Sequence, residues 1–133
     1  MYKPVKFIAK IPFKDSYTYY LFCLSSKTLL PVEIEKENSE TSAIPSIYNS
    51  LGRILKALKC SIVRISIYHI NDGILYTYLT IQREKFMLDL NIGFKDGMEI
   101  AKELSIPIYV KEKIIRECGI EVTKELINRA LKI

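Results

Sequence analysis

The chain has 133 residues, of which 49% are hydrophobic and 26% charged, with 5 glycines and 5 prolines. This balance is typical of a globular protein with a core of its own, and it excludes a disordered or low-complexity chain. A formal net charge of +5 favours acidic partners such as nucleic acid, although no long run of like charges marks a dedicated basic tract. We therefore expect residues 1–133 to form a single domain.

The sequence predicts a cytoplasmic protein without a membrane partner. No apolar run is long enough to span a bilayer, and residues 1–10 lack the apolar stretch and cleavage site of a signal peptide. Cys23, Cys60 and Cys118 are far apart and form no CxxC pair, which favours buried thiols over disulfides or a zinc site. The Lys, Glu and Ile content would suit a thermophile.

The first third of the chain predicts β-strands. Residues 5–13 alternate apolar and polar side chains with the period of a strand, and residues 17–24 are rich in aromatic, β-prone residues. Turn-like residues 14–16 separate these two segments, and residues 29–34 supply a third strand. Residues 35–41 contain no apolar side chain, which predicts an exposed connection.

The clearest predicted helix follows, over residues 47–58. Apolar residues recur there at helical spacing and form one stripe, namely Ile47, Leu51, Ile54, Leu55 and Leu58. Arg53, Lys56 and Lys59 lie off that stripe. They are candidate phosphate-binding cations, and a solvated basic surface is the alternative.

Residues 63–81 predict a β-hairpin whose register can be derived. A loop of Asn71, Asp72 and Gly73, with Gly73 in the left-handed conformation, pairs Ile70 with Ile74. The core side then pairs Val63 with Ile81, Ile65 with Leu79 and Ile67 with Thr77, and the other side pairs Arg64 with Thr80, Ser66 with Tyr78 and Tyr68 with Tyr76. Asp72 serves the turn in this interpretation.

The remaining segments predict one more long strand, then helices and a short strand. Residues 86–92 alternate as a strand, 96–104 favour a short helix, 107–110 a brief strand, 111–118 a helix stopped by Gly119, and 123–131 a last helix. Strands at the start and in the middle, with inserted and C-terminal helices, indicate an α+β fold. Its sheet is expected to be mixed and mostly antiparallel, or a half-barrel.

Short strings along the chain carry a resemblance to a known family. Residues 30–34 resemble an LPIxI strand, 51–58 the helix after an RPLTHDL motif, 63–79 the pattern VxRVxIxxLxDGxFYAxL, and 106–120 the ending APIYVxExVLxxAGI. Over about residues 29–120 the chain thus resembles the bifunctional nuclease domain family, which is described as acting on both RNA and DNA. The resemblance implies an α+β fold, nucleic-acid substrates and homodimers.

The polar residues of the family motifs differ in this chain. The HD pair of the family falls on Tyr48 and Asn49. In its IDARPSDA motif, Asn91 and Gly93 replace the first Asp and the Arg, while Asp96 is retained. Because lost charges weaken metal holding and phosphate stabilisation, we expect weakened or lost catalysis. A residual site would place Tyr48, Asn49 and Asn91 in one pocket with Asp96.

Asp96 and Asp89 are the candidate catalytic carboxylates. Asp96 with Glu99 also matches a capping box, which would make Asp96 the N-cap of the helix over residues 96–104. Asp89 lies on the alternate face of its strand and is either turned toward Asp96 or solvated. Hydrolysis at such a site would imply a divalent cation such as Mg²⁺ or Mn²⁺. His69, the single histidine, lies beside the hairpin tip without an identified partner.

The outward face of the predicted hairpin is the candidate nucleic-acid surface. Arg64 can contact phosphates while Tyr68, Tyr76 and Tyr78 stack bases, as in single-strand binders. The alternative is that a helix or another subunit covers these tyrosines. Two hypotheses follow: a divergent nuclease-like protein that binds RNA or single-stranded DNA, and a non-catalytic oligomeric binding or assembly module. A homo-oligomer, with a dimer favoured, is expected in both.

Overall fold

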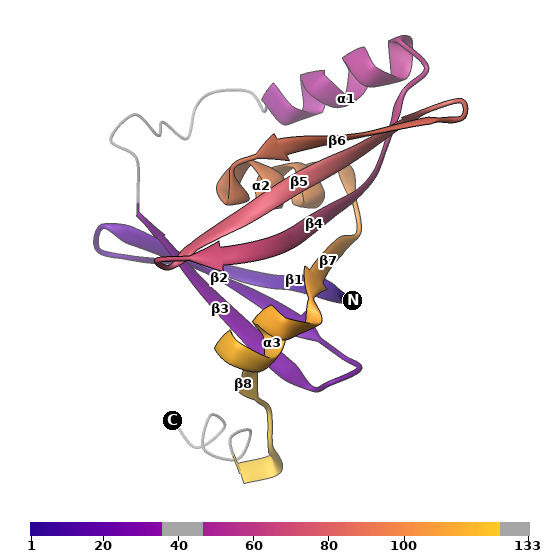
Figure 1. The fold of residues 1–133 in the computed structure, drawn as a ribbon. Coiled ribbons are helices and arrows are strands. Elements are labelled where there is room, and N and C mark those ends of the chain that lie inside the picture. The colour runs from indigo at the N-terminus through magenta and orange to yellow at the C-terminus, as the bar shows by residue number, and fades with distance from the viewer. Residues whose placement is uncertain (36–46, 126–133) are drawn as a thin grey trace.

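The computed structural model describes residues 1–35 and 47–125, which form an α+β fold with an open sheet (Figure 1). The strands are β1 (Tyr2–Phe13), β2 (Ser16–Cys23), β3 (Thr28–Glu35), β4 (Ser61–Asn71), β5 (Ile74–Arg83), β6 (Phe86–Ile92), β7 (Ile108–Lys111) and β8 (Ile120–Glu121), and the helices are α1 (Ile47–Ala57), α2 (Phe94–Leu104) and α3 (Glu112–Cys118). The strand order is β6-β5-β4-β7-β1-β2-β3-β8, with only β4 and β7 parallel among the paired strands. The predicted mixed, mostly antiparallel sheet is confirmed.

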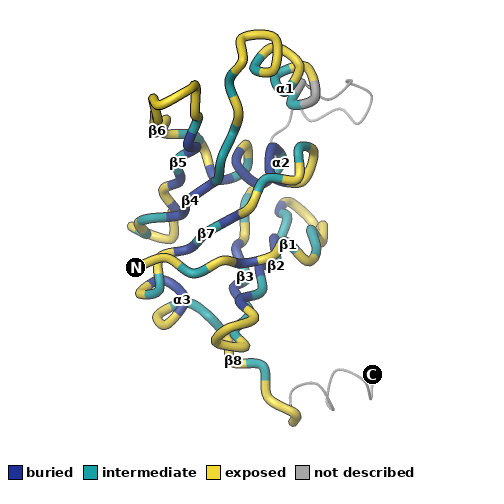
Figure 2. Tube along the Cα trace, turned by 90° about the vertical axis from the view of Figure 1, so that its right-hand side faces the viewer, coloured by how far each residue is buried: buried dark blue, intermediate teal, exposed yellow. Residues whose placement is uncertain are grey.

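The long strand β1 joins two halves of the sheet. Its first residues pair with β7 and its later residues with β2, with an irregularity between Phe7 and Ala9. Because a bulge bends and twists a strand, the halves diverge, with β6-β5-β4-β7 as the upper half in Figure 1. Figure 2 shows that the buried residues gather between these halves and at α2. α2 packs against β4 and β5, and α1 packs on α2.

The core is closed by aromatic and aliphatic side chains from both halves. Its fully buried members include Tyr19, Leu21, Ile65, Ile67, Met98 and Val110. The Tyr19 ring meets Phe94 edge-on at 5.5 Å between centroids and Phe7 at 6.0 Å, so α2 is fixed against β1 and β2. Burying such a side chain contributes about 1.5–3 kcal/mol. The position of α2 is therefore set by the core, and α2 in turn positions the candidate site.

The β4–β5 hairpin has the predicted register in its middle and a different one at its tip. Ile65 pairs with Leu79 and Ile67 with Thr77 as predicted. The predicted three-residue loop is wrong, because Asn71 pairs with Ile74 around a two-residue turn. Its residues Asp72 and Gly73 have φ values of 51° and 77°, so the predicted left-handed Gly73 is confirmed. A turn with both central residues left-handed matches the twist of the strands.

Irregularities in β4 compensate for the shorter turn. One lies between Ile67 and His69, so His69 and not Tyr68 faces Tyr76. Another lies between Ile62 and Arg64, so Ile62 faces Ile81 and the predicted core position of Val63 is wrong. Val63 instead lines a groove on the outer face. The bulges let β4 keep its central apolar residues inward, because each extra residue restores the alternation.

The start of α2 differs from the prediction. The helix begins at Phe94 with Gly93 as its N-cap, and no side chain caps it, so the predicted N-cap role of Asp96 is wrong. Asp96 lies in the first turn, where a negative charge suits the helix dipole. Phe94 is buried, and its packing starts the helix before Asp96, the position that capping chemistry alone predicts.

Some predicted segments are not described by the structure, and α1 packs differently from the prediction. The predicted last helix over residues 123–131 and the predicted connection over residues 35–41 lie largely outside the described residues, as do the side chains of Ile47 and Asn49. α1 half-buries Leu51 and Leu55, but Ile54 and Leu58 are exposed, so only part of its predicted stripe packs inward.

The predicted buried thiol is confirmed for Cys23 and is wrong for Cys60 and Cys118. Cys23 is buried, Cys60 and Cys118 are half-buried, and all three are free thiols. Among the helices of the described residues, none has the length and apolar character needed to cross a membrane.

Candidate functional site

A cleft of about 950 Å³ lies where the ends of β3 and β6 and the tip of the β4–β5 hairpin meet the start of α2. Its polar lining comprises Glu33, Glu35, Tyr68, Tyr76, Asn91, Lys95 and Asp96. The cleft therefore contains two positions of the altered IDARPSDA motif, Asn91 and Asp96, together with side chains that are distant in sequence.

Asp96 is held at this cleft by a tyrosine from α1. The Tyr48 hydroxyl donates a hydrogen bond of 2.7 Å to Asp96 Oδ1. Tyr48 occupies the His position of the HD pair, so the fold brings the two altered motifs together. Nearby, the Tyr68 hydroxyl donates to Asn91 Oδ1 over 2.9 Å. The side chain of Asn49, the other residue predicted for this pocket, lies outside the described residues.

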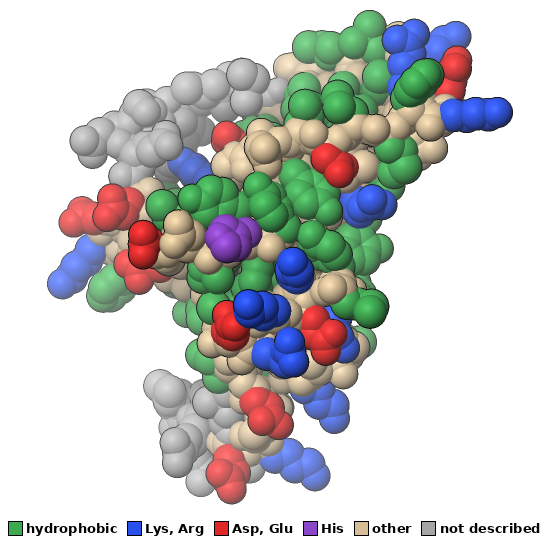
Figure 3. Space-filling model, in the orientation of Figure 1, with side chains coloured by type: hydrophobic (Ala, Val, Ile, Leu, Met, Phe, Trp, Pro, Cys, Tyr) green, Lys and Arg blue, Asp and Glu red, His purple; other side chains and the backbone are tan. Residues whose placement is uncertain are grey.

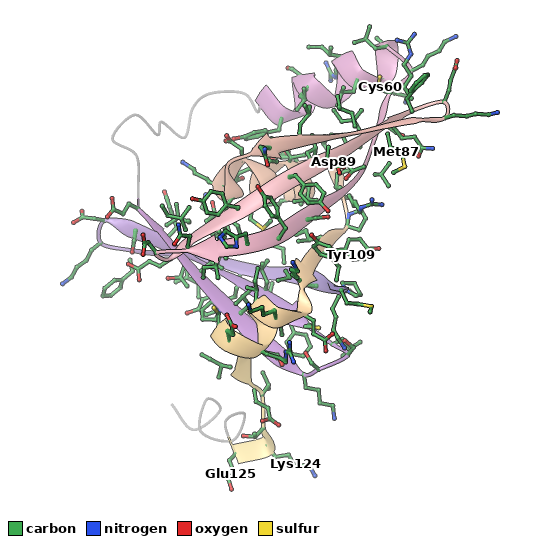
Figure 4. The ribbon with its side chains drawn as sticks, viewed as in Figure 1. Cys60, Met87, Asp89, Tyr109, Lys124 and Glu125 are labelled. Atoms are coloured by element: carbon green, nitrogen blue, oxygen red, sulfur yellow. The ribbon has the colours of Figure 1, made fainter. Side chains whose placement is uncertain are left out.

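Asp89 does not share the cleft with Asp96. It projects from β6 on the same sheet face as Asn91 but farther from α2 along the strand (Figure 4), and its Oδ1 accepts a hydrogen bond of 2.7 Å from Thr80 Oγ1. Thr80 is fully buried, so Asp89 satisfies a hydroxyl that has no access to water. The structure thus separates the two candidate carboxylates and gives Asp89 a structural partner.

The cleft is acidic in balance. Among the described residues, Glu33, Glu35 and Asp96 line it together with one cation, Lys95. Within residues 1–35 and 47–125, no three His, Cys, Asp or Glu side chains come together as a metal-binding group. Since Mg²⁺ and Mn²⁺ favour several oxygen ligands in a defined geometry, this donor set does not fit a firmly held resident ion.

Sequence reasoning missed two features of the cleft. Glu33 and Glu35 alternate on one side of β3, but nothing in the sequence indicates that β3 ends beside α2. Thr77 also lines the cleft; it is buried, and its hydroxyl has no hydrogen-bond partner among the described residues. A polar group of this kind is satisfied in most proteins by a water molecule or a ligand.

The outer face of the upper half-sheet and of the adjoining start of β1 carries clustered tyrosines, which we call the tyrosine face: Tyr2, Tyr68, Tyr76, Tyr78 and Tyr109. The Tyr68 ring centroid lies 5.3 Å from that of Tyr78 and 6.4 Å from that of Tyr76. The Tyr78 hydroxyl donates to the Tyr2 hydroxyl over 3.4 Å. Burial, followed by the hydrogen bond and charge of Tyr78, raises the pKa of Tyr2 to about 12. No helix of the described residues covers this face (Figure 1).

A groove of about 420 Å³ on the tyrosine face contains a cation. It is lined by Tyr2, Tyr78 and Tyr109 together with Arg64. Tyr68 and Tyr76 continue the aromatic surface to the acidic cleft, because both line that cleft as well. The tyrosine face and the cleft are thus adjoining surfaces.

The cations of α1 lie elsewhere. Arg53 and Lys56 line a separate groove of about 350 Å³ between α1 and the start of β4, and Lys59 is exposed just beyond α1. Arg64 lines the groove on the tyrosine face, which shares no lining residue with this one. The four predicted phosphate-binding cations therefore do not form one patch.

A half-buried ion pair, also missed by sequence reasoning, holds α2 to β1 and β2. Lys10 Nζ contacts Glu99 Oε1 at 2.9 Å, and the Tyr19 hydroxyl donates to the same oxygen over 3.2 Å. Burial alone would raise the pKa of Glu99, but the hydrogen bond and charge of Lys10, with help from Tyr19, lower it overall. Burial and the Glu99 charge raise the pKa of Tyr19.

These features define an α+β protein with an open sheet, an aromatic outer face and an adjoining acidic cleft. The sequence profile of the bifunctional nuclease domain matches residues 25–123. The chain therefore belongs to the bifunctional nuclease domain family, a nuclease-like family related to nucleic acids, and the resemblance found in the sequence is confirmed. A comparison with curated proteins finds no match.

Proposed function

We propose that this protein binds RNA or single-stranded DNA and that its nuclease activity is weakened or lost. The observation that carries the proposal is the continuity between the tyrosine face and the cleft of Asp96. A strand whose bases stack on the tyrosines would run toward the one acid that the family motif retains here. The family supports nucleic acid as the ligand. The residues at the site support binding with weakened cleavage.

The tyrosine face suits single strands. Every base has a π face, so stacking on the partly exposed tyrosines tolerates any sequence, and Arg64 offers a phosphate contact beside them. The cleft itself has an acidic lining that repels phosphate. Affinity would therefore come from the tyrosine face and from the separate cations of α1, with the cleft contributing little.

The altered motifs support slow or absent cleavage. Asp96 lies in a cleft whose lining is acidic in balance, and it accepts a hydrogen bond from a tyrosine where the family has a histidine. Asn91 offers an amide where the family has a carboxylate. These residues can orient a substrate, but they supply less of the charge that stabilises a phosphoryl transition state.

Binding can be tested by fluorescence anisotropy with labelled single-stranded RNA and DNA. The Tyr78→Ala variant is expected to lose about 1–3 kcal/mol for each base that stacks there. Tyr78→Phe, which keeps the ring, is the matched control and should bind like wild type. Equal binding by Tyr78→Ala and wild type would rule out the tyrosine face.

Cleavage can be tested with the same substrates in Mg²⁺ or Mn²⁺. We expect slow cleavage or none, and any residual activity should fall in Asp96→Asn while persisting in Asp89→Asn, since only Asp96 lines the cleft. Robust wild-type cleavage lost in Asp96→Asn would show that catalysis is intact. Loss in Asp89→Asn alone, in a folded protein, would relocate the site to the outer face.

A second candidate function is a non-catalytic assembly module on the same scaffold. The specific observation in its favour is the exposure of large apolar side chains on β6 and α1. Assembly and nucleic-acid binding use different surfaces, so the two functions are compatible.

A further inference from the structure

The groove that contains Arg64 lies at one end of the aromatic surface on the tyrosine face. Tyr78 lines this groove, and the rings of Tyr68 and then Tyr76 lead from it to the acidic cleft. In the other direction, β4 before Arg64 and β5 after Tyr78 carry no aromatic side chain. Figure 3, which colours tyrosines with the hydrophobic side chains, shows such side chains gathered over the upper half-sheet with basic ones beside them. The stacking surface therefore begins at Arg64.

The half-buried side chain of Arg64 has no carboxylate partner among the described residues, where the one ion pair joins Lys10 to Glu99. Asp89 lies on the same face, but Thr80 of β5 stands between them and pairs with Arg64 on one side and with Asp89 on the other. Two strand spacings, about 10 Å, thus separate the backbones of Arg64 and Asp89. The carboxylate of Asp89 also already accepts the Thr80 hydroxyl. The guanidinium of Arg64 is therefore free to hold the anion of a ligand.

Hydroxyl groups in the groove add neutral hydrogen-bond donors to this cation. The Tyr78 hydroxyl donates to the Tyr2 oxygen, so the Tyr2 hydroxyl keeps its own hydrogen for a further acceptor. With a pKa of about 12, Tyr2 stays protonated at neutral pH. Ser66, which is 2% exposed, lines the same groove with a third hydroxyl. A guanidinium fork beside hydroxyl donors suits a phosphate, which offers several acceptor oxygens.

We propose that this groove holds the phosphate monoester at the end of a single strand, with Arg64 and the Tyr2 hydroxyl on its oxygens and the first bases on Tyr78 and Tyr68. The inference rests on the proposed binding of single strands to the tyrosine face, and it names the part of the strand that the groove takes. The groove, of about 420 Å³, has the size of a small-ligand site, which suits one end group rather than a length of chain.

A terminal phosphate fits the groove better than an internal one for two reasons. A strand that continued past Arg64 would place its next base where β4 and β5 offer no ring for stacking. A monoester also has one more free oxygen than a diester, and above a pKa of about 6 it carries a second negative charge. Both differences strengthen the hydrogen bonds that Arg64 and the tyrosine hydroxyls can donate.

The first test compares three versions of one oligonucleotide of about six nucleotides, with a phosphate at the 5′ end, at the 3′ end, or at neither. Calorimetry without divalent cations measures binding and needs no end label. Wild type should bind one of the two phosphorylated strands at least about tenfold more tightly than the strand with hydroxyl ends, because a charge-assisted contact is added. The end that gains affinity gives the polarity of the strand on the tyrosine face.

The other outcomes of this comparison overturn the inference. Equal affinity for all three strands would remove the end site and leave the proposed function intact. An equal gain from a phosphate at either end would reflect added charge alone. Absence of binding by every strand would contradict the proposed function as well.

The second test uses variants with the same three strands. Arg64→Gln should abolish the preference for the phosphorylated end, and Tyr2→Phe, which keeps the ring, should reduce it. Arg116→Gln, at an exposed arginine of α3, is the matched control and should keep the full preference. Circular dichroism verifies that each variant is folded. A preference that survives Arg64→Gln overturns the inference, and so does an equal loss for all three strands, which would place Arg64 at an internal phosphate.

A nucleoside monophosphate distinguishes the end of a strand from a free nucleotide. It carries the same phosphate but only one base, so it should compete with the phosphorylated strand only weakly. Competition as strong as that of the unlabelled phosphorylated strand would assign the groove to free nucleotides and overturn the inference.

Discussion

At the scale of single residues, Thr77 is notable because its buried hydroxyl lacks a partner among the described residues. We predict that Thr77→Val, which keeps the shape of the side chain, stabilises the fold by about 1–3 kcal/mol, because an unsatisfied polar group is removed. Urea unfolding measures the change. A loss of stability would show that a water molecule or a residue outside the described part of the chain satisfies the hydroxyl.

Glu99 gives a second prediction at this scale. Its folded-state pKa lies below the usual value, so its ion pair contributes stability above the unfolded pKa of about 4.3 and loses it as pH falls through the lowered folded pKa. Thermal unfolding followed from neutral pH to about pH 3 should therefore show a smaller acid destabilisation in Glu99→Gln than in wild type. Identical acid profiles would mean that the Lys10 contact contributes nothing measurable. Glu103→Gln, on the exposed side of α2, is the matched control.

At the scale of elements, the end of α3 depends on Gly119. A Cβ at this position would overlap Thr28 Cγ2 and lie 2.5 Å from the Ile115 carbonyl oxygen, although the backbone itself is extended with φ of −81°. We predict that Gly119→Ala destabilises the protein by about 1–3 kcal/mol. Gly93→Ala is the control, because its Cβ would meet only Asp96 Oδ2 at 3.8 Å. Similar unfolding midpoints for the two variants would contradict this account.

The elements also show how far sequence reasoning reaches. Alternation predicts β6 with its observed bounds, and it predicts the central pairs of the β4–β5 hairpin, because inward and outward positions differ chemically there. The length of the hairpin loop could not be predicted, because an Asp-Gly pair is typical of both two-residue and three-residue loops. The first residue of α2 could not be predicted either, because the burial of Phe94 outweighs the capping preference of Asp96. Asp96 was identified from the motif, whereas Glu33 joins the cleft through tertiary packing that no local pattern encodes.

At the scale of the whole molecule, the separation of cations predicts two kinds of binding defect. Replacing Arg53, Lys56 and Lys59 together with Gln should weaken nucleic-acid binding and reduce the dependence of log Kd on log salt, because fewer counterions are released. Tyr78→Ala should weaken binding while leaving that slope unchanged. Titrations at several salt concentrations distinguish the two. An unchanged slope in the triple variant would mean that α1 does not contact the phosphates.

The pairing of β1 with both halves of the sheet has a further consequence for unfolding. Its first residues pair with β7 and its later residues with β2, so neither half can release β1 without breaking the ladder of the other. The two halves should therefore lose their structure together, in one cooperative transition.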